Sequence, residues 1–186
     1  MNGRWLPNAI SIARIALVIP VAWSIIRGED QTALILIIIA GLSDALDGLL
    51  AKGLGWTTDL GTILDPIADK VFMAGSFIAA LWVGLIPLWI TVIVIARDAI
   101  IVTGALIYRL HVGDFKPQPS ALSKVNTFLQ LLLVLAVVAR HYPPGLPDGT
   151  VLALVIAVAI TTLGSGVDYS VRWGRRLARA PRRRPA

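Results

Sequence analysis

Four aspartates stand in two close pairs within a sequence that is otherwise mostly apolar. Asp44 and Asp47 are three residues apart, and Asp65 and Asp69 are four apart. Helical residues at these spacings share one face, so each pair presents two carboxylates in the same direction. Four like charges that converge in an apolar environment need cations to neutralise them. Ligand sets made only of oxygen favour Mg²⁺, Mn²⁺ or Ca²⁺, and two such ions bridged by carboxylates serve phosphoryl and phosphodiester chemistry.

Small residues accompany both pairs and favour a ligand-binding site. Gly48 and Ala51 continue the helix face of Asp44, and Gly61 lies one turn before Asp65. Small side chains let a ligand or a second backbone approach closely. Two alternatives remain open: a pathway for protons or cations, and helix-end charges that water solvates. A transporter often shows internal repeats, whereas this sequence shows none and its acids cluster at one end of the predicted helices, which favours an enzyme.

The composition predicts that the elements carrying these residues lie in a membrane. Hydrophobic residues make up 56% of the 186-residue chain and charged residues 15%, with a mean hydropathy of +0.78. Soluble domains carry about 25% charged residues, and a membrane-spanning helix needs about 20 mostly apolar ones. The chain has no cysteine and only two histidines, which excludes disulfides and a histidine-built metal site. We therefore predict an all-α integral membrane bundle of six transmembrane helices, at residues 6–26, 32–52, 60–83, 86–109, 120–140 and 150–172.

The distribution of basic residues predicts the orientation of this bundle, because basic side chains favour the cytoplasmic ends of membrane helices. With the N-terminus inside, Lys52, Lys124 and the arginines after residue 171 fall at inner ends. Arg27 and Arg140 fall at outer ends, next to acidic residues. Both termini are therefore predicted to be cytoplasmic.

The end of the chain is rich in arginine and predicts a separate segment. We expect a transmembrane domain at 1–174 and a basic cytoplasmic tail at 175–186. Such a tail suits the anionic headgroups of a lipid membrane. It lacks interleaved aromatic residues, so we predict no nucleic-acid partner.

The stretch from Ser43 to Lys70 carries a long motif, SDALDGLLAKGLGWTTDLGTILDPIADK. It resembles the signature D-x2-D-G-x2-A-R-x8-G-x3-D-x3-D of the CDP-alcohol phosphatidyltransferase family. Residue type and spacing agree at Asp44, Asp47, Gly48, Ala51, Gly61, Asp65 and Asp69. Lys52 departs from the motif, because the family usually has arginine there. Lysine keeps the positive charge but loses the planar fork that grips phosphate through two bonds, so the detailed role of Lys52 is open.

The resemblance implies a fold and an activity. Members of this family are six-helix membrane enzymes, usually homodimers, that move a phosphatidyl group from a CDP-linked lipid to an alcohol and release CMP. By this resemblance, two divalent ions, Mg²⁺ or Mn²⁺, would be held by Asp44, Asp47, Asp65 and Asp69. The CDP-lipid would lie against Gly48, Ala51, Lys52, Gly61 and Asn8, although helix capping is an equal alternative for Asn8. Asp69 would also be the catalytic base for the acceptor hydroxyl; a competing view makes it only a metal ligand, since a bound cation lowers its proton affinity.

Positions outside the motif resemble the part of the family's site that receives the acceptor. Arg97 matches an arginine of an R-[DE] pair that holds the acceptor phosphate, and its neighbour Asp98 is expected to point about 100° away around the helix. Lys124 starts a predicted helix, where its charge opposes the helix dipole unless it meets an anion. We assign Arg97, Lys124, Asn126 and Arg14 to acceptor binding. The alternatives are that Asn126, in a polar stripe, joins two helices and that Arg14 snorkels at a helix start.

Three segments resemble the branch of the family that makes cardiolipin: Arg97-Asp98, residues 123–130 and residues 161–176. This resemblance implies CDP-diacylglycerol as donor and phosphatidylglycerol as acceptor. It also implies a bacterial cytoplasmic (inner) membrane, with the active site on the cytoplasmic side. The alternative acceptor is glycerol 3-phosphate, which would yield phosphatidylglycerophosphate.

Overall fold

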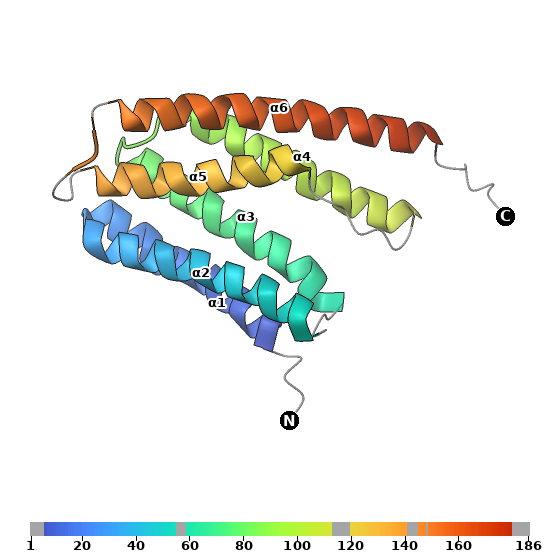
Figure 1. The fold of residues 1–186 in the computed structure, drawn as a ribbon, viewed down its shortest axis with the longest axis horizontal. Coiled ribbons are helices and arrows are strands. Elements are labelled where there is room, and N and C mark those ends of the chain that lie inside the picture. Colours follow the sequence, from blue (N-terminus) through green and yellow to red (C-terminus); the bar gives the residue numbers. More distant parts are fainter. Residues whose placement is uncertain (1–5, 55–58, 113–119, 141–144, 148, 180–186) are drawn as a thin grey trace.

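The computed structural model describes residues 6–54, 59–112, 120–140, 145–147 and 149–179, and its side chains are described from residue 8 to 172 apart from 44–60, 62–63, 105–119, 141–144 and 148. The described residues form six helices and no strand (Figure 1). They are α1 (Leu6–Arg27), α2 (Asp30–Leu54), α3 (Asp59–Trp82), α4 (Leu88–Val112), α5 (Ala121–Ala139) and α6 (Thr150–Arg179). The all-α class is confirmed, and each helix overlaps the apolar stretch predicted for it. The largest difference is in α6, which continues well beyond the predicted end at residue 172.

Three of the described helices are long and apolar enough to cross a membrane: Asn8–Arg27, Ala121–Ala139 and Thr150–Arg172. The described part of α2, Asp30–Ser43, is a shorter apolar helix. Many large apolar side chains face outward, and Ile19, Leu152 and Ile160 are each more than half exposed. An apolar surface of this kind is unusual on a soluble monomer. It suits contact with lipid hydrocarbon.

Glycines end α1 and α3 at the same end of the bundle, which we call the Arg27 end. Gly28 and Gly84 both adopt positive φ, +70° and +75°, a conformation that costs glycine little because it has no Cβ. In each turn the glycine N–H donates to a carbonyl three residues back, and the next residue's N–H donates to a carbonyl five residues back. These paired bonds satisfy carbonyls that the helix end leaves free. They reverse the chain tightly, so α2 and α4 run back toward the opposite end, where α1 begins and α6 ends (Figure 1).

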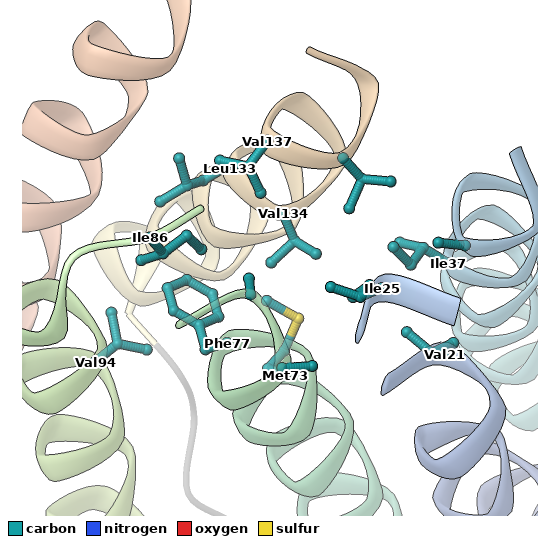
Figure 2. Close-up of a cluster of buried hydrophobic side chains, with 14 of the residues drawn as sticks. Val21, Ile25, Ile37, Met73, Phe77, Ile86, Val94, Leu133, Val134 and Val137 are labelled. Carbon is teal, nitrogen blue, oxygen red and sulfur yellow. The ribbon is translucent and has the colours of Figure 1, made fainter. Parts of the chain in front are cut away.

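A buried apolar cluster lies around α3 in the half of the bundle near the Arg27 end. Figure 2 shows Met73 and Phe77 of α3 at its centre. They are surrounded by Val21 and Ile25 of α1, Ile37 of α2, Ile86 before α4, Val94 of α4, and Leu133, Val134 and Val137 of α5. All of these side chains are buried. The cluster packs α3 into a core shared with four other helices, and α3 carries the second aspartate pair.

The packing between α1 and α3 is especially close. Gly75 of α3 faces Val18 of α1, and a Cβ atom at Gly75 would overlap the Val18 side chain. Protein interiors are packed at the density of organic crystals, so there is little room for the helices to move apart. This contact sets the spacing of α1 and α3 beyond Asp65 and Asp69, toward the Arg27 end.

Candidate active site

Asp65 and Asp69 lie one turn apart on α3, and both side chains are half-buried. Their helical spacing agrees with the face predicted from the sequence. Asp65 accepts a hydrogen bond from the Oγ of Ser11, a fully buried residue of α1. A hydrogen bond to a carboxylate that could bind a metal fixes the orientation of its oxygens. The hydrogen bond between Ser11 of α1 and Asp65 of α3 therefore orients one carboxylate of the predicted metal site.

The other half of the predicted metal site lies on α2. Asp44 and Asp47 belong to the helical part of α2, as do Gly48, Ala51 and Lys52, but their side chains lie outside the described residues. Among the side chains that are described, no group of three or more acidic, histidine or cysteine residues stands close enough to hold a metal ion. Convergence of the four aspartates remains a prediction. Asp65 and Asp69 fit a hard divalent cation by their chemistry, because they offer oxygen ligands only.

Lys70 links α3 to α4 beside this aspartate pair. Its Nζ lies 3.0 Å from Oδ2 of Asp98 and 3.8 Å from Oδ2 of Asp69. The other oxygen of Asp98, Oδ1, accepts a hydrogen bond of 2.6 Å from Nη1 of Arg97. Asp98 therefore holds one cation on each of its oxygens.

Arg97 is only 5% exposed and joins three helices. Besides Asp98, its Nε donates to Oγ of Ser165 on α6 at 3.0 Å, and its Nη2 donates to Oγ of Ser123 on α5 at 2.6 Å. As expected, Arg97 and Asp98 reach different helices, because Arg97 contacts α5 and α6 while Asp98 contacts Lys70 of α3. Their side chains also meet, which was not predicted. Their Cα–Cβ directions diverge, but the long arginine side chain curves back to its neighbour. The predicted role of Arg97 in acceptor binding remains a prediction.

The polar stripe on α5 consists of Ser123, Asn126, Thr127 and Gln130, and it makes specific contacts with α6. Asn126 is fully buried, and its Oδ1 accepts hydrogen bonds of 2.8 Å from Oγ1 of both Thr161 and Thr162. These contacts match the helix-joining alternative for the stripe. Gln130, one turn further on, is also fully buried, and its amide has no hydrogen-bond partner among the described residues.

The remaining predicted site residues differ in how they are exposed. Lys124 is exposed near the start of α5, which Ser120 caps by accepting from the backbone N–H of Ser123. Arg14 is buried on α1, and Asn8 is half-buried one turn and a half before it. Gly61 of the motif is buried at the start of α3. Lys124 is therefore the one of these four that presents an exposed cation.

Two residues of this region had no assigned role from sequence. Ser11 belongs to the opening of α1, where Asn8, Ser11 and Arg14 recur at three-residue intervals on one helical face. That spacing is the signal that could have placed Ser11 near the site. Lys70 directly follows the last aspartate of the motif, but nothing in its spacing indicates a partner on α4.

Comparison with known proteins identifies the family. A profile of the CDP-alcohol phosphatidyltransferase family matches residues 4–163. A cardiolipin synthase (CMP-forming) of Streptomyces coelicolor is 36% identical over 129 residues, which cover 66% of this chain and 60% of the relative. The cardiolipin synthase (CMP-forming) of Rattus norvegicus is 31% identical over 193 residues, which cover 94% of this chain and 63% of the relative.

A relative whose name includes glycerol 3-phosphate has a comparable sequence identity to this chain. The CDP-diacylglycerol–glycerol-3-phosphate 3-phosphatidyltransferase of Bacillus subtilis is 30% identical over 185 residues, which cover 90% of this chain and 95% of the relative. By contrast, the chain spans about three fifths of the length of the two cardiolipin synthases. The family profile covers most of the chain, and the apolar helices agree with it: the protein is an integral membrane member of the CDP-alcohol phosphatidyltransferase family.

Proposed function

We propose that this protein transfers the phosphatidyl group of CDP-diacylglycerol to phosphatidylglycerol, forming cardiolipin and releasing CMP. The observation that carries the proposal is the aspartate motif within a family match that extends over residues 4–163. The two cardiolipin synthases among its relatives support the choice of acceptor. The hydrogen bond from Ser11 to Asp65 supports a site built to hold carboxylates in a set orientation.

The aspartates supply the chemistry in this proposal. Asp44, Asp47, Asp65 and Asp69 would hold two divalent ions, Mg²⁺ or Mn²⁺, which would offset the charge on the pyrophosphate and on the departing CMP. Asp69 accepts the proton of the acceptor hydroxyl. The hydroxyl oxygen then bonds to the phosphorus of the phosphatidyl group, and the bond from that phosphorus to the bridging oxygen breaks. The bridging oxygen leaves on CMP.

The surrounding residues position the two substrates. Gly48, Ala51 and Gly61 give the nucleotide close access to the helices, while Lys52 and Asn8 contact the CDP-lipid. On the acceptor side, Arg97, Asn126 and Arg14 line the buried part of the site and Lys124 meets the phosphate of the headgroup. The exposure of Lys124 supports this last role, because its ammonium can reach an anion without leaving a buried partner.

The membrane setting follows from the same proposal. We infer six transmembrane helices, with both termini and the active site on the cytoplasmic side of a bacterial inner membrane, in a homodimer. Because both substrates carry acyl chains, they enter laterally from the bilayer, and their headgroups meet the aspartates at headgroup depth. The beginning of α1 and the end of α6 lie at one end of the bundle, as this topology requires (Figure 1).

The second candidate acceptor is glycerol 3-phosphate. The Bacillus subtilis relative, which this chain matches over almost the whole of that protein, favours it. The chemistry at the aspartates is the same for both acceptors, so only the acceptor distinguishes the two functions.

A paired acceptor assay tests the proposal. The purified protein, in detergent or vesicles, receives CDP-diacylglycerol and Mg²⁺ with either phosphatidylglycerol or glycerol 3-phosphate, and mass spectrometry identifies the lipid products. We expect cardiolipin and CMP only with phosphatidylglycerol. If phosphatidylglycerophosphate forms, and only with glycerol 3-phosphate, then glycerol 3-phosphate is the acceptor. The family assignment and the chemistry at the aspartates would still hold. Samples with EDTA, or with the Asp69→Asn variant, are the negative controls.

A further inference from the structure

Two cations and two carboxylates meet where α3 faces α4, and their distances are unequal. We propose that Asp98, itself fixed by Arg97, is a positioning residue that holds the Lys70 ammonium off Asp69. The Lys70 ammonium then pairs with Asp69 only at 3.8 Å, without a direct hydrogen bond, so it competes less strongly with a divalent cation for the Asp69 oxygens. This inference rests on the proposed function, because it assigns Asp69 to a metal site.

The distances show which carboxylate holds the ammonium. Nζ of Lys70 lies 3.0 Å from Asp98, a hydrogen-bonding distance, and 3.8 Å from Asp69, which is beyond it. Both Lys70 and Asp69 keep some exposure, at 18% and 31% of their side chains. The lysine side chain has four flexible carbons, so without Asp98 its ammonium could turn the short remaining distance to Asp69.

Asp98 is in turn held in place by its other contacts. Its Oδ1 accepts from Arg97, which is anchored by Ser165 and Ser123 on two other helices. Asp98 therefore presents Oδ2 to Lys70 from a fixed position. The arginine, the carboxylate and the lysine form one chain of contacts that runs from α6 and α5 through α4 to α3.

The alternating charges of Arg97, Asp98 and Lys70 suit a position beside a metal site. An ammonium bonded directly to Asp69 would compete with a divalent cation for the same oxygens. Arg97 alone is enough to neutralise the buried carboxylate of Asp98, because a single cation balances one carboxylate. Lys70 is therefore a second cation that Asp98 does not need for its own neutralisation. Its contact with Asp98 is explained if Asp98 serves to keep Lys70 from bonding directly to Asp69.

The test measures Mn²⁺ binding to the purified full-length protein by electron paramagnetic resonance of the free ion. Binding that is lost in Asp65→Asn is counted as the specific fraction. We expect Asp98→Asn to weaken this specific binding about tenfold, a size typical of coupled neighbouring residues. We expect Lys70→Met to restore the affinity of Asp98→Asn to within about threefold of the parent, because the competing ammonium is gone.

Matched variants separate this effect from general damage. Asp168 forms a similar ion pair with Arg172, at 2.6 Å, elsewhere on α6, so Asp168→Asn should leave Mn²⁺ affinity unchanged. Should Asp98→Asn fail to fold, the double variant Ser123→Ala with Ser165→Ala loosens Arg97 without removing a charge. It should weaken Mn²⁺ binding by a smaller factor, and again only while Lys70 is present.

Two results would overturn the positioning role. One is unchanged Mn²⁺ affinity in Asp98→Asn, or in the double serine variant where that one must be used. The other is an equal loss with and without Lys70→Met, which would make the effect of Asp98 independent of the lysine. Absence of specific Mn²⁺ binding by the parent protein would instead contradict the metal site of the proposed function, so the two failures are distinguishable.

Discussion

The two sides of α3 are held by different kinds of interaction. Toward α1 the contact is close and apolar where Gly75 meets Val18, and it includes a hydrogen bond from Ser11 to Asp65. Toward α4, α5 and α6 the contact near the aspartates is ionic and runs through Lys70, Asp98 and Arg97. The comparison indicates that the α1 side sets the direction of a carboxylate, whereas the α4 side sets the charge around it.

The largest expected effect comes from removing the carboxylate on the α1 side. Asp65→Asn keeps the size of the side chain but loses a charged metal ligand. Metal ions contribute several kcal/mol to such reactions, so we expect the rate of CMP release to fall about a thousandfold. Asp168→Asn is the control, because it changes an aspartate with an arginine partner far along α6. A rate of CMP release within tenfold of the parent would show that Asp65 is not a metal ligand.

A smaller loss is expected when the carboxylate remains but its orienting contact is removed. Ser11→Ala deletes the hydroxyl that donates to Asp65. Loss of a hydrogen bond to a metal ligand typically costs about 10- to 100-fold in metal affinity or activity. Titration of activity with Mg²⁺ should therefore show a raised metal requirement. If the Mg²⁺ requirement matched that of the parent, the α1 side would hold α3 only by packing.

The apolar part of the α1 contact is tested by stability rather than activity. Gly75→Ala places a Cβ where the Val18 side chain lies, and such overpacking costs about 1–3 kcal/mol. Thermal unfolding in detergent should shift to lower temperature, and Val18→Ala in the same chain should reverse most of the shift. Gly166→Ala is the matched control, since its Cβ would make only an ordinary contact, 3.8 Å from Arg97. Equal shifts in both glycine variants would mean that the helix, rather than the α1 contact, is affected.

The smallest effect is expected in the polar contacts between α5 and α6. Thr162→Val removes one of two hydroxyls that donate to Asn126 and keeps the shape of the side chain. Hydrogen bonds between membrane helices contribute about 0.6 kcal/mol on average, and Thr161 still donates to the same oxygen. Thermal unfolding should therefore move only slightly, with CMP release unchanged. A large loss of activity at unchanged stability would contradict this prediction and show that both hydroxyls are needed to orient Asn126 toward the acceptor.

The helices were predictable because their signals are local. Apolar stretches of spanning length and turn residues such as Gly28 and Gly84 mark where helices begin and end. The end of α6 was missed for a physical reason. Hydropathy falls after residue 172, but alanine, leucine and arginine there are good helix formers, so the helix continues to Arg179 after the apolar stretch has finished.

Within the candidate site, the spacing of Asp65 and Asp69 was enough to place them on one face of a helix. The partners of these residues were not predictable in the same way. The contact from Ser11 depends on how α1 packs against α3, and that from Lys70 depends on the distance to α4. The pairing of Arg97 with Asp98 was missed because helix spacing gives the direction of a Cβ atom, not the reach of a long side chain.

The measurement that tests the central claim most directly is CMP release from CDP-diacylglycerol by the purified protein. We expect CMP to form in equal amount to a new phospholipid, to stop with EDTA, to resume with added Mg²⁺ and to be absent in Asp69→Asn. No CMP from monodisperse protein with either phosphatidylglycerol or glycerol 3-phosphate, together with cation flux that Asp65→Asn abolishes, would contradict the account and make the aspartates a cation pathway.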